Sequence, residues 1–180
     1  MDTNRISIEF SSSVYLVILI STLIWCLMIV LAPLFAQMGG AYRNISGFVY
    51  WFYSPVCHQD DARSFFIFGN KLAVCSRCSS LYFSFLLGIV IYPFVKKVSD
   101  VTLPSVWFLL GAAALMFADA MLDIFGILKN THLTRSITGV ILGFVLVFYL
   151  VPGFINFFHE IYSFVKFNMK NKARNEHQPQ

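Results

Sequence analysis

Charged side chains are scarce in this sequence. Only 12% of its 180 residues are Asp, Glu, Lys or Arg, whereas an ordinary soluble domain carries about 25%. Hydrophobic residues make up 58% of the chain, and such an excess is typical of a protein that is buried in lipid. The net charge is only +4 and the basic residues form no stripe, so the sequence gives no reason to expect nucleic-acid binding.

Cysteine is also sparse, with four residues. Cys26 lies inside a long apolar run, where a thiol usually acts as a small hydrophobic side chain. The other three, Cys57, Cys75 and Cys78, lie outside such runs or at their edges. This odd number of remaining thiols argues against a simple disulfide scaffold.

Long apolar runs, by contrast, are prominent. Four of them are candidate transmembrane helices: residues 14–36, 78–95, 103–125 and 135–151. At about 1.5 Å per residue, the first run reaches about 34 Å, enough to cross a hydrocarbon core of about 30 Å. Its length, and the acidic residues Asp2 and Glu9 before it, favour a retained helix over a cleaved signal peptide. The sequence therefore predicts an all-α integral membrane bundle of about four transmembrane helices.

The extent of the domain follows from these runs. We predict a single transmembrane domain over residues 1–165 and a polar, basic C-terminal tail over residues 166–180. A Pro-Gly pair is expected to kink or end the fourth helix, so residues 154–167 form either its last part or an interfacial helix. Gly139 and Gly143 form a G-x-x-x-G pair, which lets another helix approach closely.

Four spans place both termini on one side of the membrane. The connections 37–77 and 126–134 then share the opposite face, where most of the unusual polar residues converge. The aromatic segment 48–53 is too short to span and is expected at the membrane interface. The basic residues that flank the spans favour cytoplasmic termini by the positive-inside rule. The Cys/His-bearing connection between the first two helices is thus expected on the outer face.

Two short motifs predict a metal site in that connection. Cys57-His58 is one, and Cys75-Ser76-Arg77-Cys78 is the other. A C-x-x-C pair can place two thiolates on one tetrahedral ion, and zinc prefers sulfur and nitrogen ligands. The candidate ligands are therefore Cys57, His58, Cys75 and Cys78, although neighbours such as Cys57 and His58 rarely both reach one ion.

The same C-x-x-C pair is also compatible with redox chemistry. Cys75 and Cys78 lie where the second helix should begin, with Arg77 between them. A helix N-terminus and a nearby cation both stabilise a thiolate. Three interpretations of the pair therefore stay open. It is a redox-active dithiol with Cys57 as resolving thiol, or it supplies two ligands to a metal ion, or it is purely structural, as buried thiols or a disulfide.

Charged residues inside the predicted spans form a further group. Asp119 and Asp123 are four residues apart and share one face of a helix, at a cost of about 2.5–3.5 kcal/mol each if they lie at mid-membrane. Either of them is a candidate general base for a hydrolytic metal site. Arg135 is expected either to pair with them or to join Arg63 or Arg77 in holding an anionic lipid headgroup or phosphate.

These motifs together resemble an uncharacterised family of small prokaryotic integral membrane proteins, catalogued as a domain of unknown function. The resemblance covers about residues 45–145. It is carried by Cys57-His58-Gln59, Arg63-Ser64, Cys75-Ser76-Arg77-Cys78 with Tyr82, and Arg135 with Thr138-Gly139. It implies that one shared site is formed by Cys57, His58, Gln59, Arg63, Cys75, Arg77 and Cys78. We expect this site in the prokaryotic cytoplasmic membrane, with Gln59, Arg63 and Arg77 as the cofactor-binding candidates.

The chain is also faintly similar to quinone-linked thiol oxidases, which have four helices and a C-x-x-C pair near a span. It lacks a second cysteine pair in the 126–134 connection. Three hypotheses stand at this point. The first is a zinc site, structural or hydrolytic, with Asp119, Asp123 and Arg135 as catalytic candidates. The second is a quinone-linked thiol–disulfide oxidoreductase that uses Cys75 and Cys78, and the third is a non-enzymatic lipid-binding or assembly protein.

Overall fold

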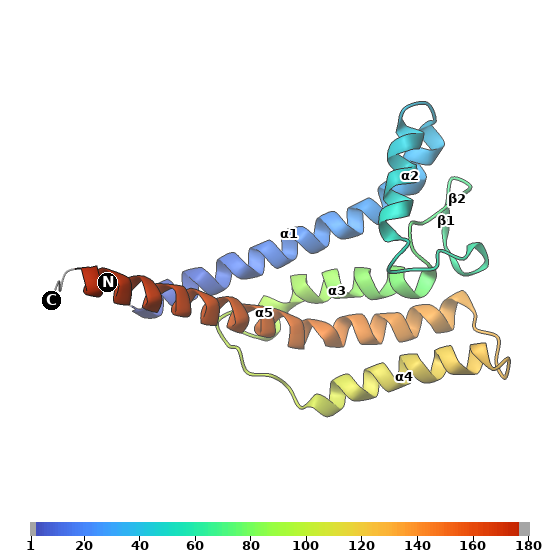
Figure 1. Ribbon diagram of the computed structural model, residues 1–180. Coiled ribbons are helices and arrows are strands. Elements are labelled where there is room, and N and C mark those ends of the chain that lie inside the picture. Colours follow the sequence, from blue (N-terminus) through green and yellow to red (C-terminus); the bar gives the residue numbers. More distant parts are fainter. Residues whose placement is uncertain (1–2, 177–180) are drawn as a thin grey trace.

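The computed structural model describes the backbone of residues 3–176 and the side chains of residues 10–169. Within this part of the chain there are five α-helices and one short β-hairpin (Figure 1). The helices are α1 (Thr3–Met38), α2 (Tyr42–Tyr53), α3 (Ser76–Val95), α4 (Val106–Ile124) and α5 (His132–Glu176). A 3-10 turn, η1 (Asp61–Arg63), and the antiparallel strands β1 (Phe66–Ile67) and β2 (Asn70–Lys71) lie between α2 and α3.

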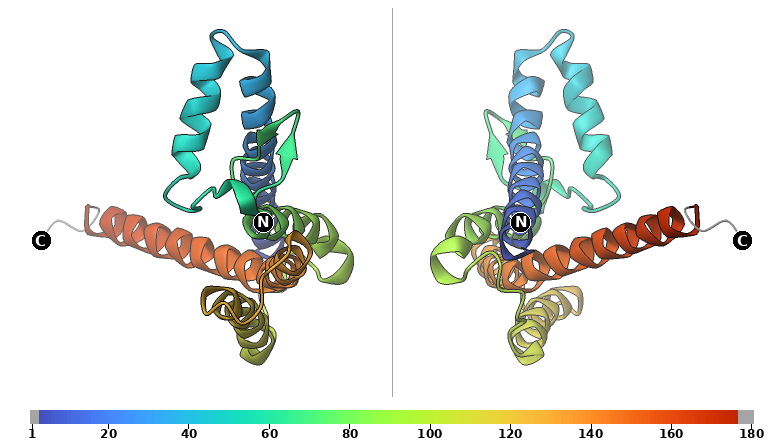
Figure 2. Two further views of the ribbon diagram at one scale, coloured as in Figure 1. Left: turned by 90° about the vertical axis from the view of Figure 1, so that its right-hand side faces the viewer. Right: turned by 90° about the vertical axis from the view of Figure 1, so that its left-hand side faces the viewer.

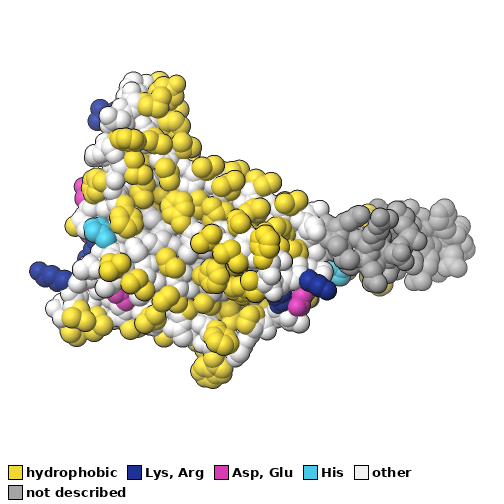
Figure 3. Space-filling view, turned by 180° about the vertical axis from the view of Figure 1, so that it is seen from behind, with side chains coloured by type: hydrophobic (Ala, Val, Ile, Leu, Met, Phe, Trp, Pro, Cys, Tyr) yellow, Lys and Arg dark blue, Asp and Glu magenta, His cyan; other side chains and the backbone are white. Residues whose placement is uncertain are grey.

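The predicted membrane bundle is confirmed. Four helices are long and apolar enough to cross a membrane: Phe10–Met38, Ser76–Val95, Val106–Ile124 and His132–Met169. Figure 1 shows both ends of the chain at one end of the bundle, with α2 and the β-hairpin at the other. On the face shown in Figure 3, hydrophobic side chains cover much of the surface between the two ends, and the charged side chains in view lie towards those ends, as a bilayer requires.

The fourth span is longer than the sequence predicts. Of the two alternatives, residues 154–167 are the last part of the fourth helix and not a separate interfacial helix, because α5 continues through Pro152 from His132 to Glu176. Membrane helices tolerate an internal proline when neighbouring groups satisfy the freed backbone, and Val151 and Pro152 are buried here. The predicted tail, as far as residue 176, belongs to this helix. Residues 177–180 lie outside the described residues.

The core of the bundle is the contact between α3 and α5, which is the most extensive in the fold. Val147 and Val151 of α5 meet Ile89 and Tyr92 of α3 in a buried cluster. Tyr15 of α1 joins it by donating a hydrogen bond to the carbonyl oxygen of Ile89 at 2.9 Å. By contrast, α4 packs chiefly against α5 and buries only Ala112, so most of its surface faces lipid.

A second buried cluster fixes the other end of the bundle. Here Ile29 and Ala32 of α1 pack with Val49 and Tyr53 of α2 and with residues 72–74. Tyr53 donates to the carbonyl oxygen of Trp25 at 2.8 Å. Figures 1 and 2 show α1 bending before it joins α2, so that the α1–α2 hairpin leaves the long axis of the bundle. Pro33 lies inside α1, and an internal proline is the usual cause of such a bend.

The G-x-x-x-G pair is the point where α3 and α5 come closest. A Cβ atom built on Gly139 would lie 2.5 Å from the carbonyl oxygen of Arg77, and one on Gly143 would collide with the carbonyl oxygen of Leu81 and with Ser84 Oγ. Since two of these three obstacles are backbone atoms, a side chain at either position has to push the helices apart. The close approach predicted from the two glycines is therefore present.

We predict that Gly143→Ala destabilises the bundle by about 1–3 kcal/mol, because an added methyl group overpacks a tight contact. Thermal unfolding in detergent measures the loss as a lower Tm. Gly153→Ala is the matched control, since it lies in the same helix with nothing within 4 Å of the added atom. An unchanged Tm in Gly143→Ala would contradict this account of the packing.

Candidate metal centre and adjoining cavity

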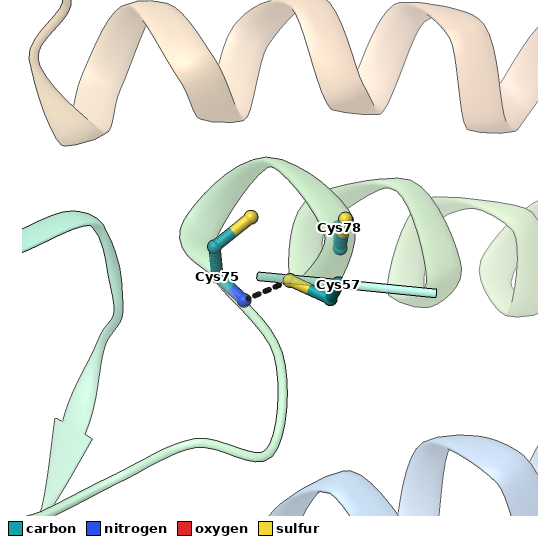
Figure 4. Close-up of side chains that lie close together, drawn as sticks. All are labelled: Cys57, Cys75 and Cys78. Atoms are coloured by element: carbon teal, nitrogen blue, oxygen red, sulfur yellow. Dashed lines mark hydrogen bonds between the residues drawn. The ribbon is translucent and has the colours of Figure 1, made fainter. Parts of the chain in front are cut away.

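Three cysteine side chains meet where the connection after α2 reaches the start of α3. Cys57 lies just after α2, and its N–H donates to the carbonyl oxygen of Tyr53 at 3.0 Å. Cys75 is the extended residue at the N-cap of α3, where its side chain makes no capping hydrogen bond. Cys78 follows in the first turn. The N–H of Cys75 donates to Cys57 Sγ at 3.2 Å, as Figure 4 shows.

The three sulfur atoms are close enough to share one ion. The Sγ atoms of Cys57, Cys75 and Cys78 all lie within 4.8 Å of one another. Two thiolates bound to one tetrahedral zinc at about 2.3 Å are about 3.8 Å apart, so side-chain adjustments of an ångström or less would complete the geometry. Cys57 is 6% exposed and the other two are partly buried. Cys26 is buried elsewhere, against the carbonyl oxygen of Tyr82.

The cluster stabilises a thiolate. Hydrogen bonds from the Cys57 and Cys78 thiols hold the pKa of Cys75 well below its ordinary value, against the opposing effect of burial. The N–H of Cys78 and that of Arg77 also lower this pKa. Since the thiolate is the form that binds metals and attacks electrophiles, Cys75 is prepared for either kind of chemistry.

His58 does not join the sulfur cluster. Its side chain is exposed and it is not among the residues that converge on the shared centre. The next residue, Gln59, has a positive φ of 53° and donates from Nε2 to the carbonyl oxygen of Tyr50 at 2.6 Å. Lys71 Nζ binds the carbonyl oxygen of Gln59 at 2.8 Å. These contacts and the positive φ hold the backbone of Gln59 in place.

A cavity of about 470 Å³ opens beside the sulfur atoms. The three cysteines line it, together with Val56, His58, Gln59, Asp60, Arg63, Arg77, Ile124 and Arg135. The structure thus brings eight of the ten predicted site residues to one cavity. The two that do not line it are Asp119 and Asp123, which come from α4 and contact the arginines.

Each arginine of the cavity is paired with a carboxylate. Arg77 Nη2 binds Asp119 Oδ2, and Arg135 Nη2 binds Asp123 Oδ2 at 2.5 Å. Arg63, whose side chain is half-exposed, lies 3.1 Å from Asp60 and 3.6 Å from Asp123. The Arg135 side chain is only 6% exposed, so removal of its partner would leave a buried, uncompensated charge.

Two neighbours of α4 and α5 complete the network. The N–H of Asn130 donates to Asp123 Oδ1 at 3.0 Å, and its side-chain amide donates to the carbonyl oxygen of Asp119 at 2.7 Å. Thr138 Oγ1 lies 3.4 Å from Asp119 Oδ2.

The sequence did not predict Asp60 as a site residue. Asp60 lines the cavity, pairs with Arg63 and accepts a hydrogen bond from the N–H of Ala62 at 3.1 Å. Its position three residues before Arg63 is the only signal that pointed to it.

Comparison with known proteins agrees with this description. The sequence profile of a family described as "Predicted membrane protein (DUF2085)" matches residues 57–149, which include all three clustered cysteines and the three arginines. An uncharacterised protein of Methanocaldococcus jannaschii is 44% identical over 149 residues, covering 81% of this chain and 96% of the relative.

No solved structure matches the chain. The relation of the chain to known proteins therefore depends on the family match and on this relative. The family match covers α3, α4 and the first part of α5, with the three cysteines, and the relative covers 81% of the chain. The chain belongs to the family of predicted membrane proteins designated DUF2085.

Proposed function

We propose that this membrane protein binds one zinc ion through Cys57, Cys75 and Cys78 at one end of its helical bundle. The observation that carries the proposal is the convergence of three sulfur atoms, from two separate segments, within 4.8 Å of one another. Soft thiolate ligands select zinc and a few other thiophilic metals. Such an ion would tie the connection after α2 to the start of α3.

The fourth coordination position distinguishes a structural from a catalytic site. Closed sites use four protein ligands, whereas catalytic zinc has three ligands and an exchangeable water. Three sulfur atoms beside a cavity of about 470 Å³ favour the second arrangement, in which the ion lowers the pKa of its water. His58 lines this cavity from an exposed position, so it would act near the ion rather than close the site.

The contacts of the carboxylates bear on their proposed role. Asp119 and Asp123 are engaged by Arg77 and Arg135 and do not line the cavity. This arrangement favours a positioning role, in which they orient the arginines, over the role of general base. Arg135 would then face the substrate directly. We place the site at the outer face of a prokaryotic cytoplasmic membrane, on the positive-inside argument.

The stabilised thiolate of Cys75 favours a second candidate function. A Cys75 thiolate beside Cys78 is suited to thiol–disulfide chemistry. In that reaction the dithiol would lose two electrons and two protons, one S–S bond would form, and a quinone would be reduced to the quinol. A purely structural cluster in a lipid-binding or assembly protein is the third alternative, in which neither metal binding nor thiol reactivity is expected.

Elemental analysis tests the metal proposal. Protein purified under reducing conditions is expected to hold about one zinc per chain, and the double variant Cys75→Ser/Cys78→Ser is expected to lose it. Cys26→Ser is the control, because Cys26 lies outside the cluster, and it should retain the metal. Metal-free wild-type protein whose Cys75–Cys78 bond cycles with added quinone would favour the oxidoreductase instead.

Alkylation of the metal-stripped protein tests the thiolate. Because the pKa of Cys75 is lowered, the residue stays deprotonated on acidification, and its reaction with iodoacetamide should change little between about pH 6 and 8. An ordinary thiol with a pKa of about 8.5 would react about tenfold more slowly per unit of pH below that value.

Peptide mass spectrometry follows the modification of Cys75. In Cys57→Ala/Cys78→Ala the two side-chain hydrogen-bond donors to Cys75 are lost and only the backbone N–H donors remain, so the reaction should become more strongly pH-dependent. A steep pH dependence in the wild-type protein would rule out the stabilised thiolate. Added zinc is expected to protect Cys75 from the reagent if the metal proposal holds, which links the two experiments.

A further inference from the structure

We propose that the cavity beside the cysteines binds a phosphate group, held by Arg63, Arg77 and Arg135 together with the open position of the metal. The inference rests on the proposed zinc site and names the class of ligand that the site would take. Guanidinium groups are suited to phosphate, because their planar donors match its oxygen atoms. The three arginines come from η1, α3 and α5 and line one cavity.

The positions of two of these arginines are unfavourable for the helices that carry them. Arg77 is in the first turn of α3 and Arg135 is in the first turn of α5, where the helix dipole favours negative charge. Their partners, Asp119 and Asp123, lie in the last two turns of α4, where the dipole disfavours it. Helix stability therefore does not explain this placement. An anion in the cavity would face both N-termini and both guanidinium groups.

The pairing geometry leaves donors for a ligand. Arg77 and Arg135 each contact a carboxylate through Nη2, and both carboxylates belong to α4, outside the cavity lining. Arg63 is half-exposed, and its nearest partner, Asp60, is also half-exposed. Asp60 is the carboxylate that lines the cavity, so it is the group that an incoming phosphate would displace from Arg63.

The charge balance shows that net charge alone does not attract an anion to this cavity. The three arginines are matched by Asp60, Asp119 and Asp123, and three thiolates with one divalent ion leave one negative charge. An anion gains little from net charge under these conditions. It gains from direct bonds to the guanidinium donors and to the ion, which act strongly in a partly desolvated cavity.

The location of the cavity fits a phosphate at the membrane surface. The α1–α2 hairpin lies across the long axis of the bundle at the same end (Figures 1 and 2). Its exposed side chains include Ile45, Phe48 and Trp51, and hydrophobic groups cover much of the hairpin in Figure 3. A helix of this kind lies at the level of the lipid headgroups. The phosphate could come from a lipid headgroup or from free phosphate.

Zinc-loaded full-length protein in detergent allows both sources to be tested. Equilibrium dialysis with radiolabelled inorganic phosphate measures the first, and native mass spectrometry with phosphatidic acid, against phosphatidylcholine, measures the second. We expect Arg63→Gln to weaken binding about tenfold or more, because one charge-assisted interaction is lost. Arg43→Gln, which removes the same charge from an exposed position on α2, should bind like the wild-type protein.

Asp60→Asn is expected to bind phosphate more tightly, and a misfolded variant could not produce such an increase. The amide keeps the shape of the side chain and its oxygen, which accepts from the N–H of Ala62 in the native protein, but it frees Arg63 from a competing charge. We expect several-fold tighter binding in this variant, in whichever arm the wild-type protein binds. Binding of inorganic phosphate alone would identify free phosphate as the ligand, and binding of phosphatidic acid alone would identify the headgroup.

Zinc content, measured on the same samples, separates the two proposals. Protein that holds zinc but binds neither probe would overturn the phosphate site and leave the metal centre intact. Protein without zinc would overturn the metal centre, and the phosphate site that depends on it. Equal binding by Arg63→Gln and the wild-type protein would also contradict the assignment.

Discussion

The close approach of α3 and α5 is the constraint on which the rest of the structure depends. Gly139 and Gly143 bring the two backbones together beside the carbonyl groups of Arg77 and Leu81. This contact sets the first turns of both helices side by side, so that Arg77, Cys78 and Arg135 line one cavity. The connection after α2 then has only to deliver Cys57. Van der Waals contact between small residues, which drives helix association in lipid, thereby determines where the cysteine cluster and its cavity lie.

Electrostatics at this end of the bundle is organised by pairing rather than by net charge. Charged groups are costly near the hydrocarbon region unless they are paired, and each buried arginine of the cavity has a carboxylate within ion-pair distance. Asn130 in turn donates to the carboxylate of Asp123 and to the backbone carbonyl oxygen of Asp119. As a result, guanidinium groups of defined orientation lie beside the three sulfur atoms. An isolated cluster of thiols would have no such cationic groups around it.

The sequence predicted the fold well because the signal for a membrane helix, a long uncharged apolar run, is strong and local. At Pro152 it left two alternatives open, a helix that ends and one that continues, because the environment that lets α5 continue through a proline is tertiary. The cysteine cluster was predictable from C-x-x-C spacing and four-span topology. The exclusion of His58 was not, because it depends on the local backbone, in which Gln59 has a positive φ. Similarly, the spacing of Asp119 and Asp123 showed that they share a face but did not show which arginine each one meets.

The loose attachment of α4 has a mechanical consequence. This helix packs chiefly against α5 and buries little of its surface, yet it carries both carboxylates that hold Arg77 and Arg135. A sideways displacement of α4 in the bilayer would release both guanidinium groups at once. A change in lateral pressure or bilayer thickness that displaces this one lipid-facing helix would thus leave two unpaired guanidinium groups near the sulfur cluster, without any movement of the cysteines themselves.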